Sequence, residues 1–387
     1  MAGAFGGLPR GALAIAAACL VTLTGCRAPI PFHGGPRRDA PVLGFGGAAP
    51  YVSLPPAVPR RDVYAHTRSG MLSRAVRRVP SRVYVADAGG AAVVVIDPST
   101  YRVVGRIRVG PHPSFVLPSW DLKTLWVNDA RGLTPINPRT GRRGRARPVA
   151  AGPLTMAFTP NGRHALVMAD GPPRIDVRDP HTMRLRRSIP LPCHGPAAAD
   201  FTADGDALVA GCATSGQLIR VDLRHAEVTQ IRRLSPPALL QDIKLAPDGT
   251  FFYVSDMARG GVWTIDAQRL RPTAFIPTGA GAHGLIPSRD GRVLYVTNQS
   301  DGTISLIDVA AGQVVRQWPL PGDGSPDMGG VSADGAVLWL SGRRHGVVYA
   351  VSTATGRLIR TIAAGRGAHG VCVFPQPGRH SLGHTYR

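Results

Sequence analysis

The sequence predicts an all-β protein, a seven-bladed β-propeller in which the C-terminal strand pairs with the first blade. Two observations predict this fold. The chain repeats itself seven times with a period of 40 to 44 residues, and each repeat carries the same three markers. Between the markers the residues alternate in polarity or run β-branched, as in Val93–Ile96. Four short strands per repeat make a blade that cannot bury both faces alone, whereas seven blades stacked around an axis bury them.

Each marker has a physical role in a blade. The first is a strand that ends in an aromatic or aliphatic anchor, with copies at Tyr84, Trp126, Leu166, Val209, Tyr253, Tyr295 and Trp339. The second closes the next strand and caps a turn by accepting backbone N–H bonds, with copies at Asp97, Asn137, Asp179, Asp222, Asp266, Asp308 and Ser352. The third is a hairpin turn, mostly Asp-Gly or Asn-Gly, which supplies positive φ, with copies at Asp121, Asn161, Asp204, Asp248, Asp290, Asp334 and Pro377.

The order of the strands predicts how the ring closes. The first repeat begins at Arg82 with the second strand of a blade, and the last repeat ends with a first strand near Val371–Phe374. The C-terminal strand should therefore complete the blade that residues 82–109 begin. We expect the propeller to span residues 81–379, followed by a short C-terminal tail over residues 380–387.

The N-terminus reads as an export signal. Residues 1–25 hold one charge, Arg10, followed by a 12-residue apolar run over residues 12–23 that is too short to span a bilayer. The run ends in Leu-Thr-Gly-Cys, which resembles the bacterial lipobox, and this resemblance implies lipidation of Cys26. Residues 26–80 are predicted to be a Pro/Gly-rich tether and strap. The flexible tether at residues 27–61 has an r.m.s. span of about 30 Å, and residues 62–80 form either a short helix or a strap along the propeller. The signal and the lipobox-like motif predict that the chain is extracytoplasmic and attached to the membrane through its lipid. No transmembrane helix is expected after the signal.

The composition favours anionic partners without naming one. The formal net charge is +21, which falls to +20 when residues 1–25 are removed, and nearly all of the positive charge is Arg. The basic runs at residues 142–147, 184–187, 232–233 and 343–344 lack interleaved aromatic residues, so they do not form a stacking platform for single-stranded nucleic acid. An exported chain is also not expected to meet genomic DNA. Anionic cell-wall polymer, a small molecule or a surface protein are the partners we expect, and the chain should be a monomer.

One repeat carries a recognisable motif. Tyr295-Val296-Thr297-Asn298, followed by Gly302–Asp308 and Ser332–Gly335, resembles the YVTN-type β-propeller repeat, and Tyr84–Asp87 and Tyr253–Asp256 are degenerate copies. The resemblance covers roughly residues 82–379 and is closest in type to actinobacterial surface lipoproteins. It implies a seven-bladed propeller at the cell surface. The family includes lactone hydrolases, haem-binding domains and binding modules, so it implies no single activity.

The candidate site residues lie just before the innermost strands, where the chain enters the central channel at one mouth. Gly281–Gly284 and Gly367–Gly370 are copies of one Gly-Ala-His-Gly motif, and Asp327 lies at the matching offset between them. His283, Asp327 and His369 therefore fall on three consecutive blades and should be neighbours. Gln241 has the same offset one blade earlier. Also near this mouth are Asp242, which is adjacent to it, and His194 and His112, which are slightly out of register.

Two His and one Asp could bind Zn²⁺ or Fe²⁺, or act as general bases on a small substrate. The alternative is a ring of solvated polar groups, which any propeller mouth is expected to have. No local HxH or HxxxH spacing supports a metal, so a metal site would rest on the geometry of the ring alone. We expect no obligatory cofactor, with a divalent metal as the one candidate.

The cysteines add one expectation. Cys193 and Cys212 flank a predicted hairpin in a chain whose export permits a disulfide, although the hairpin register requires the loop to fold back. Cys372 lies in an apolar strand and should be a buried small side chain. The leading hypothesis is thus a ligand- or partner-binding module acting through the channel mouth. The alternatives are a lactonase-like hydrolase or lyase that uses the His/Asp residues, and a metal or haem carrier.

Overall fold

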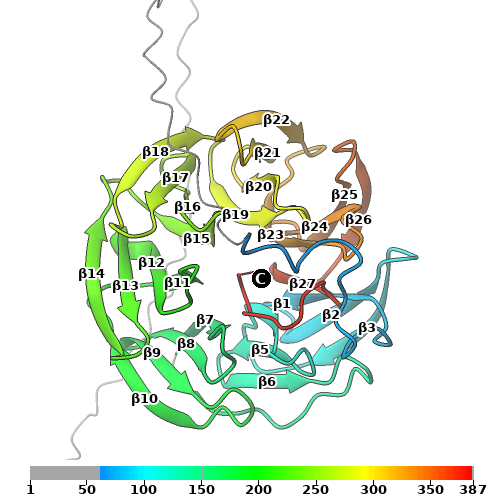
Figure 1. Ribbon diagram of the computed structural model, residues 1–387. Helices are drawn as coiled ribbons and strands as arrows, with labels where there is room; N and C mark the ends of the chain where they lie inside the picture. The colour runs from blue at the N-terminus through cyan, green and yellow to red at the C-terminus, as the bar shows by residue number, and fades with distance from the viewer. Residues whose placement is uncertain (1–61, 150–151, 386–387) are drawn as a thin grey trace, which may run out of the picture. The chain divides into compact units, whose positions relative to one another are not determined.

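Seven β-sheets form a ring around a central channel in the computed structural model of the chain (Figure 1). The structure describes residues 62–149 and 152–385. The predicted signal, Cys26 and most of the predicted tether lie outside these residues. Within them, no helix is long and apolar enough to cross a membrane. The predicted fold class, an all-β seven-bladed propeller, is confirmed.

The strands of each blade are given in order from the innermost to the outermost. Blade 1 contains β27 (Ala368–Phe374), β1 (Arg82–Asp87), β2 (Ala92–Asp97) and β3 (Arg102–Arg108). Blade 2 contains β4 (Phe115–Pro118), β5 (Leu125–Asp129) and β6 (Gly132–Ile136). Blade 3 contains β7 (Pro153–Phe158), β8 (Ala165–Asp170), β9 (Pro173–Arg178) and β10 (Leu185–Pro190). Blade 4 contains β11 (Pro196–Phe201), β12 (Ala207–Cys212), β13 (Gln217–Asp222) and β14 (Glu227–Arg233), with the 3₁₀ turn η1 (Ala213–Ser215) after β12.

The remaining blades are regular. Blade 5 contains β15 (Leu240–Leu245), β16 (Phe251–Asp256), β17 (Gly261–Asp266) and β18 (Pro272–Pro277). Blade 6 contains β19 (Ala282–Pro287), β20 (Val293–Asn298), β21 (Thr303–Asp308) and β22 (Gln313–Pro319). Blade 7 contains β23 (Pro326–Val331), β24 (Val337–Gly342), β25 (Val347–Ser352) and β26 (Leu358–Ala363).

The ring closes inside blade 1, as the strand order predicts. Strand β27 pairs antiparallel with β1, so that Arg82 lies opposite Phe374 and Val83 opposite Val373. These residues are joined to the core between blades 7 and 1, where Val83, Trp339 and Val373 are buried. The predicted closure by the C-terminal strand is therefore confirmed.

The sequence markers have the expected roles, with one difference in strand length. Oδ1 of Asp97 accepts the backbone N–H of Ser99 at 2.9 Å, which caps the turn after β2. The anchor residues do not end their strands, however: β1 runs three residues beyond Tyr84 and β20 runs three residues beyond Tyr295. The residues after the anchor still pair with the neighbouring strand, as Asn298 does with Thr303. The ladder of backbone pairs therefore continues beyond the buried anchor residue.

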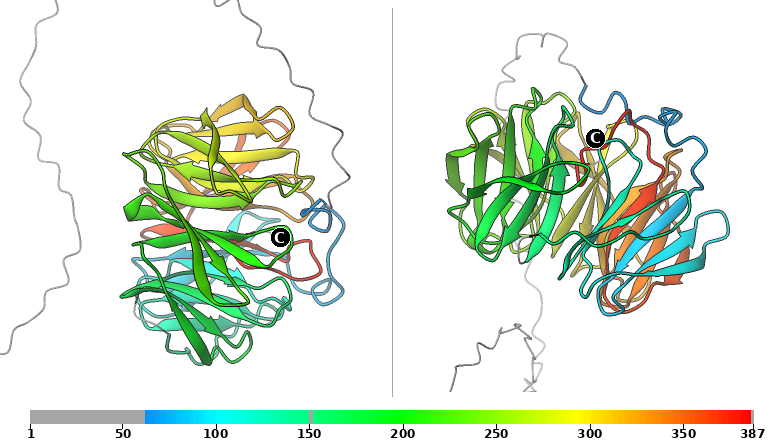
Figure 2. Two further views of the ribbon diagram at one scale, coloured as in Figure 1. Left: turned by 60° about the vertical axis from the view of Figure 1, so that its left-hand side comes forward. Right: turned by 90° about the horizontal axis from the view of Figure 1, so that it is seen from below.

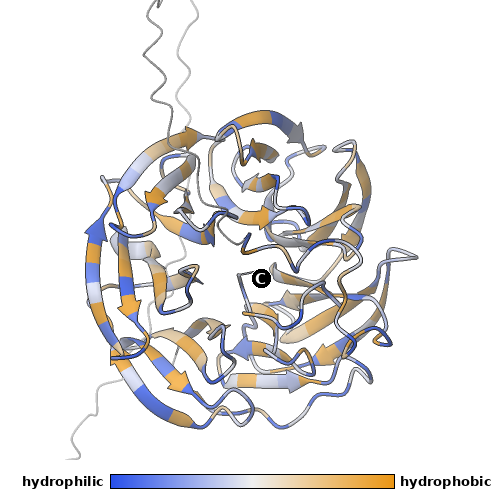
Figure 3. Ribbon diagram, in the orientation of Figure 1, coloured by the Kyte–Doolittle hydropathy of each residue, from blue (hydrophilic) through white to orange (hydrophobic). Residues whose placement is uncertain are grey.

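Blade 2 departs from the predicted four strands. Its outer position is occupied by the basic run at residues 142–147, which makes only isolated bridges, Ile136 to Arg143 and Leu133 to Arg147. Four arginines in six residues repel one another, and Pro135 in β6 has no N–H to offer the ladder. The other outer strands, such as β10 and β14, contain both hydrophilic and apolar residues, and most of their side chains are exposed (Figure 3).

The two faces of the ring differ. The inner strands begin at one face of the ring, which we call the cluster face. They end at the opposite face, where every inner strand except β27 turns into a hairpin, and we call this the hairpin face. Residues 62–80 form turns rather than a helix and lie on the hairpin face, where the Tyr64 hydroxyl donates to the carbonyl of Leu245 at 3.1 Å. The C-terminal segment lies toward the same face, and Leu72 bridges to Gly378 (Figure 2).

The chain does not leave the molecule after blade 1. Residues 379–385, which we call the tail, turn back into the channel, so that the last described residues lie near the centre of the ring in Figure 1. Ser381 and Thr385 are 0% exposed, and Leu382 and His384 are also buried. Gly383 bridges antiparallel to Ala157 of β7, so the tail runs from the hairpin face toward the cluster face.

Candidate metal site in the channel

β-Bulges aim the candidate residues into the channel. In blade 6, Ala282 pairs with Asn298 and Leu285 with Val296, so His283 and Gly284 together lie opposite the single residue Thr297. Inner strands β15, β23 and β27 carry the same irregularity at Gln241, Asp327 and His369. A bulge leaves one residue out of the ladder and redirects its side chain, which is why such bulges recur beside functional sites.

The ring brings three of these side chains together. Nδ1 of His283 lies 2.9 Å from Oδ1 of Asp327, and Nε2 of His369 lies 3.8 Å from Oδ2 of the same carboxylate. One ligand atom from each residue lies within 4.8 Å of the other two. Blades 3 and 4 have Leu154 and Ala197 at their bulges. The charged or imidazole side chains at the bulges thus lie on blades 6, 7 and 1, next to Gln241 at the bulge of blade 5.

The cluster is buried rather than washed by solvent. The side chains of His283, Asp327 and His369 are 9%, 0% and 14% exposed. Despite the short contact, Nδ1 of His283 and both carboxylate oxygens of Asp327 make no well-aligned hydrogen bond. A buried carboxylate without hydrogen bonds costs several kcal/mol unless a cation compensates it. A ring of solvated polar groups does not describe these residues.

The protonation states favour a cation at this point. Nδ1 of His369 lies 3.0 Å from the carbonyl oxygen of Ser114, which can only accept, so Nδ1 carries the proton. Burial lowers the pKa of His369, with Asp327 offsetting this only in part. The neutral ring therefore turns the lone pair of Nε2 toward Asp327, and two acceptors face each other.

His283 and Asp327 influence each other more strongly. Burial alone would lower the pKa of His283, but the neighbouring Asp327 carboxylate outweighs it and raises that pKa above the usual value. Burial alone would raise the pKa of Asp327, but His283 and His369 hold it well below its usual range. The carboxylate thus stays ionised in the channel, paired with either a proton on His283 or a metal ion.

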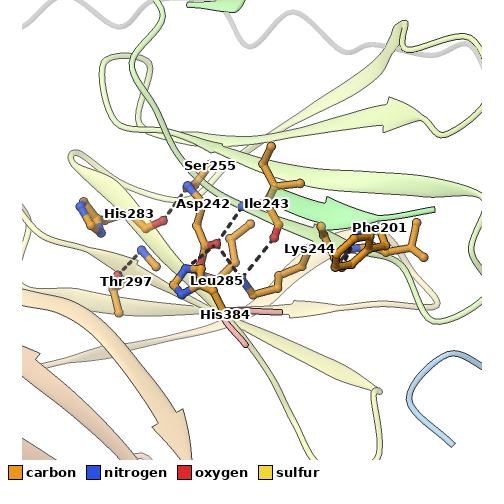
Figure 4. A network of polar contacts seen from close by, with 12 residues as sticks. Phe201, Asp242, Ile243, Lys244, Ser255, His283, Leu285, Thr297 and His384 are labelled. Carbon is orange, nitrogen blue, oxygen red and sulfur yellow. Dashed lines mark hydrogen bonds and ion pairs between the residues drawn. The ribbon is translucent and has the colours of Figure 1, made fainter. Parts of the chain in front are cut away.

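Hydroxyl groups of neighbouring blades fix the backbone of the cluster. The Thr297 hydroxyl accepts the N–H of Gly284 at 2.8 Å and donates to the carbonyl of Asp327 at 2.7 Å. Ser255 has the same role one blade earlier, where it accepts the N–H of Asp242 and donates to the carbonyl of His283 (Figure 4). These hydroxyls lie at the third position of Tyr-Val-Thr-Asn and Tyr-Val-Ser-Asp. Sequence reasoning found that motif but assigned it only a role in the fold.

The glycine of each Ala-His-Gly motif lets two blades approach. A Cβ on Gly284 would lie 2.6 Å from the carbonyl oxygen of Asp327, and one on Gly370 would lie 2.5 Å from that of Ser114. Gly370 also donates its N–H to the Ser114 carbonyl, which His369 contacts as well. Close contact between blades is therefore part of what holds the two histidines beside Asp327.

The other predicted site residues lie apart from the cluster. Gln241 occupies the matching bulge but is only half-buried. Asp242 is buried and contacts Lys244 and His384 instead, with Nζ of Lys244 2.6 Å from its Oδ1. His194 is exposed and lies 3.5 Å from Asp170, and His112 is exposed in a loop with φ of 51°.

The predicted cysteine pair forms a disulfide. Cys193 and Cys212 are bonded, with their Cα atoms 5.9 Å apart. The loop folds back at Gly195, which has a φ of 70° and whose carbonyl accepts the N–H of Ala213. Cys372 is buried and free, and burial raises the pKa of its thiol to about 12.

The fold and the site define a seven-bladed β-propeller with a buried His₂Asp cluster in its channel. Residues 54–379 match the model of the YNCE-like beta-propeller family, and the chain belongs to that family. This agrees with the resemblance to YVTN-type repeats. A search of curated proteins finds no match.

Several solved structures share the fold. Hydrazine synthase of Kuenenia stuttgartiensis is 20% identical over 71% of this chain and 93% of that chain, with a TM-score of 0.63. A functionally unknown protein from Desulfotomaculum acetoxidans is 14% identical over 77% and 99%, with a TM-score of 0.67. Dihydro-heme d1 dehydrogenase NirN in complex with DHE is 15% identical over 81% and 79%, with a TM-score of 0.52. At these identities the likeness shows the fold alone.

Proposed function

We propose that this chain is a divalent-cation-binding propeller of the extracytoplasmic space, with His283, Asp327 and His369 as the protein ligands. The observation that carries the proposal is a buried carboxylate that lacks hydrogen bonds and faces two imidazole nitrogens within 4.8 Å. Zinc bound by N and O ligands at about 2.0–2.2 Å separates them by about 3.4 Å, so small side-chain shifts would complete the site.

The donor set limits the choice of metal. Two imidazoles and one carboxylate suit Zn²⁺ or Fe²⁺ and are poorly suited to Ca²⁺ or Mg²⁺, which prefer oxygen ligands. Three protein ligands leave a coordination position for water or for a small ligand. The hydrogen bond from His369 to Ser114 fixes the tautomer that a metal needs, the usual arrangement around metal-bound histidines.

The test is metal content and titration of the mature protein. We expect about one Zn²⁺ per chain by elemental analysis after loading and dialysis, and a loss of binding in Asp327→Asn and His283→Ala. His194→Ala, which removes an exposed histidine outside the cluster, is the matched control and should bind as wild type does. A wild-type protein that takes up no Zn²⁺, Fe²⁺, Co²⁺ or Ni²⁺ in calorimetry would refute the proposal.

The location belongs to the same proposal. The apolar run that ends in Leu-Thr-Gly-Cys supports export and lipidation at Cys26. The Cys193–Cys212 disulfide also supports export, because disulfides form and persist in oxidising compartments. In cells that express the full chain, we expect it in the membrane fraction, and Cys26→Ser should release it into the soluble extracytoplasmic fraction. A wild-type chain that fractionates with the cytoplasm would contradict this location.

The second candidate function is hydrolysis or elimination on a small substrate such as a lactone. The open coordination position favours it, because a bound cation would lower the pKa of a water molecule there and make it a nucleophile near neutral pH. Turnover of a lactone panel by the zinc-loaded protein, abolished in His283→Ala, would establish this activity. A haem carrier would instead show a Soret band in the purified protein.

A further inference from the structure

The tail occupies the channel from the hairpin face. The N–H of Phe158 donates to the carbonyl of Leu382 at 3.2 Å, and the N–H of Ser381 donates to the carbonyl of Trp120 at 3.1 Å. The ring of His380 stacks on Trp120, with centroids 5.0 Å apart. The tail is thus bonded to the inner strand of blade 3 and to the turn of blade 2, and these backbone contacts hold it at the hairpin face.

The deep end of the tail reaches across the channel to blade 5. Nε2 of His384 lies 3.3 Å from Oδ1 of Asp242, which is also paired with the buried Lys244 (Figure 4). The other carboxylate oxygen of Asp242 accepts the N–H of Leu285 in blade 6. A histidine from the tail is therefore part of a buried polar network that joins two blades on the far side of the channel.

A single aromatic ring separates the tail from the metal cluster. Phe115 packs edge-on against His384 and against His369, each at a centroid distance of 4.9 Å. A cavity of about 20 Å³, with room for about one water molecule, lies between Gly383 and His384 of the tail and blades 1, 2, 6 and 7. On the side of blades 3, 4 and 5, the tail instead borders a cavity of about 890 Å³ at the hairpin face, which His380, Leu382 and the segment 62–67 also line.

We propose that the tail is a stopper, which closes the hairpin-face mouth so that the cation and its ligands exchange only through the cluster face. This proposal rests on the proposed cation site for its purpose, but the closure itself does not need a metal. The ring closes through β27, which ends before the tail begins, so the stopper can be removed without opening a blade.

The first test removes the stopper from the zinc-loaded protein. We compare the full chain with a chain that ends at Gly378 and follow the transfer of Zn²⁺ to an excess of a small chelator. We expect the same metal content in both, and release at least ten times faster without the tail. Equal release rates from two folded proteins of equal metal content would overturn the proposal.

A second measurement does not depend on the metal. Cys372 lies in the wall of the small cavity and is buried. We expect alkylation of Cys372 by a small maleimide, quantified on its peptide by mass spectrometry, to be slow in the full chain and much faster without the tail. Equally slow alkylation in both proteins would overturn the stopper, whereas absence of metal from the full chain would count only against the cation site.

If the shortened chain fails to fold, the full-length Leu382→Ala/His384→Ala variant replaces it. This variant removes the apolar contact and the contact with Asp242 but keeps the backbone of the tail, and the same two measurements apply. The matched control is Val104→Ala, an exposed apolar residue on the outer strand β3. A change in the control as large as that in the tail variant would also overturn the proposal.

Discussion

At the scale of single residues, the cluster consists of three side chains that lie close together and of hydroxyl groups that hold two of their backbone carbonyls in place. His283, Asp327 and His369 could be found from their offset before the hairpin turns, because the repeat period places equal offsets at equal heights in the ring. Their burial could not be found in this way, since it depends on which side chains of other blades cover the channel. The hydroxyls of Ser255 and Thr297 belong to the family motif, yet only the structure shows that they hold the carbonyls of His283 and Asp327.

The first prediction concerns Thr297. Replacing it with Val keeps the shape but removes the hydrogen bonds to Gly284 and Asp327. We expect zinc affinity to fall by about 10- to 100-fold, as is usual for groups that orient metal ligands. Calorimetric titration measures the loss, and Thr297→Ser should restore most of it. Unchanged affinity in Thr297→Val would show that the hydroxyl supports only the fold.

The second prediction concerns His384 and pH. The pKa of His384 is lowered to about 4, chiefly by burial and also by the neighbouring Lys244, while Asp242 opposes the shift. Because the folded pKa lies below the usual 6.5, the unfolded chain takes up the proton first as pH falls. The stability due to neutral His384 is therefore complete above pH 6.5 and is lost between pH 6.5 and 4, on the order of 3 kcal/mol.

Urea unfolding of the metal-free protein at pH 7.5 and pH 4.5 checks this prediction. The decrease in unfolding free energy between the two pH values should be larger in wild type than in His384→Gln, in which this group does not titrate. His181→Gln, which changes an exposed histidine, should leave the wild-type decrease unaltered. Equal decreases in wild type and His384→Gln would show that protonation of His384 does not lower the unfolding free energy.

At the scale of strands and turns, the inner strands combine a repeated bulge with a close approach between blades. Periodicity predicted the strands well because each marker has a local physical cause, such as the Asp97 cap or the positive φ of an Asp-Gly turn. Blade 2 and the tail were not predicted in the same way. The outer position of blade 2 is set by the repulsion among its arginines, and the tail has no strand period because its contacts are made with distant blades.

The third prediction tests the close approach at Gly284. A Cβ at this position meets the carbonyl oxygen of Asp327, so Gly284→Ala must push blades 6 and 7 apart. We expect a loss of about 1–3 kcal/mol in unfolding free energy, together with weaker zinc binding. The control is Gly105→Ala in β3, where the nearest atom to a new Cβ is 3.9 Å away. Chemical unfolding that shows equal effects for the two variants would exclude this role for Gly284.

At the scale of the whole molecule, the ring is closed twice from the C-terminal side. Strand β27 completes blade 1, and the tail then enters the channel and contacts blades 2, 3 and 5. The first closure was readable from the sequence because the repeats begin and end at complementary points. The position of the tail could not be predicted from the sequence, because Gly383 and His384 make its contacts and this segment is not a copy of any part of the repeats.

The fourth prediction separates the two closures. A chain that ends at Ala364 lacks β27 and leaves β1 as an unpaired edge, so we expect it to show no cooperative unfolding transition by circular dichroism. A chain that ends at Gly378 keeps β27 and should unfold cooperatively, at a lower urea concentration than the full chain. Cooperative unfolding of the shorter chain at the same midpoint as the longer one would mean that β27 does not close the ring.

The pairing of β27 with β1 also sets the order of events when the protein is made. Blade 1 is the first to be synthesised, but its inner strand is the last, so the edge of β1 stays bare while six other blades form. Contacts between the two ends of a chain form slowly, and a bare edge invites a strand from another copy. In the final step of folding, pairing of β27 with β1 of the same chain therefore competes with pairing of β27 with β1 of another chain. A high concentration of nascent chains should favour strand-swapped oligomers.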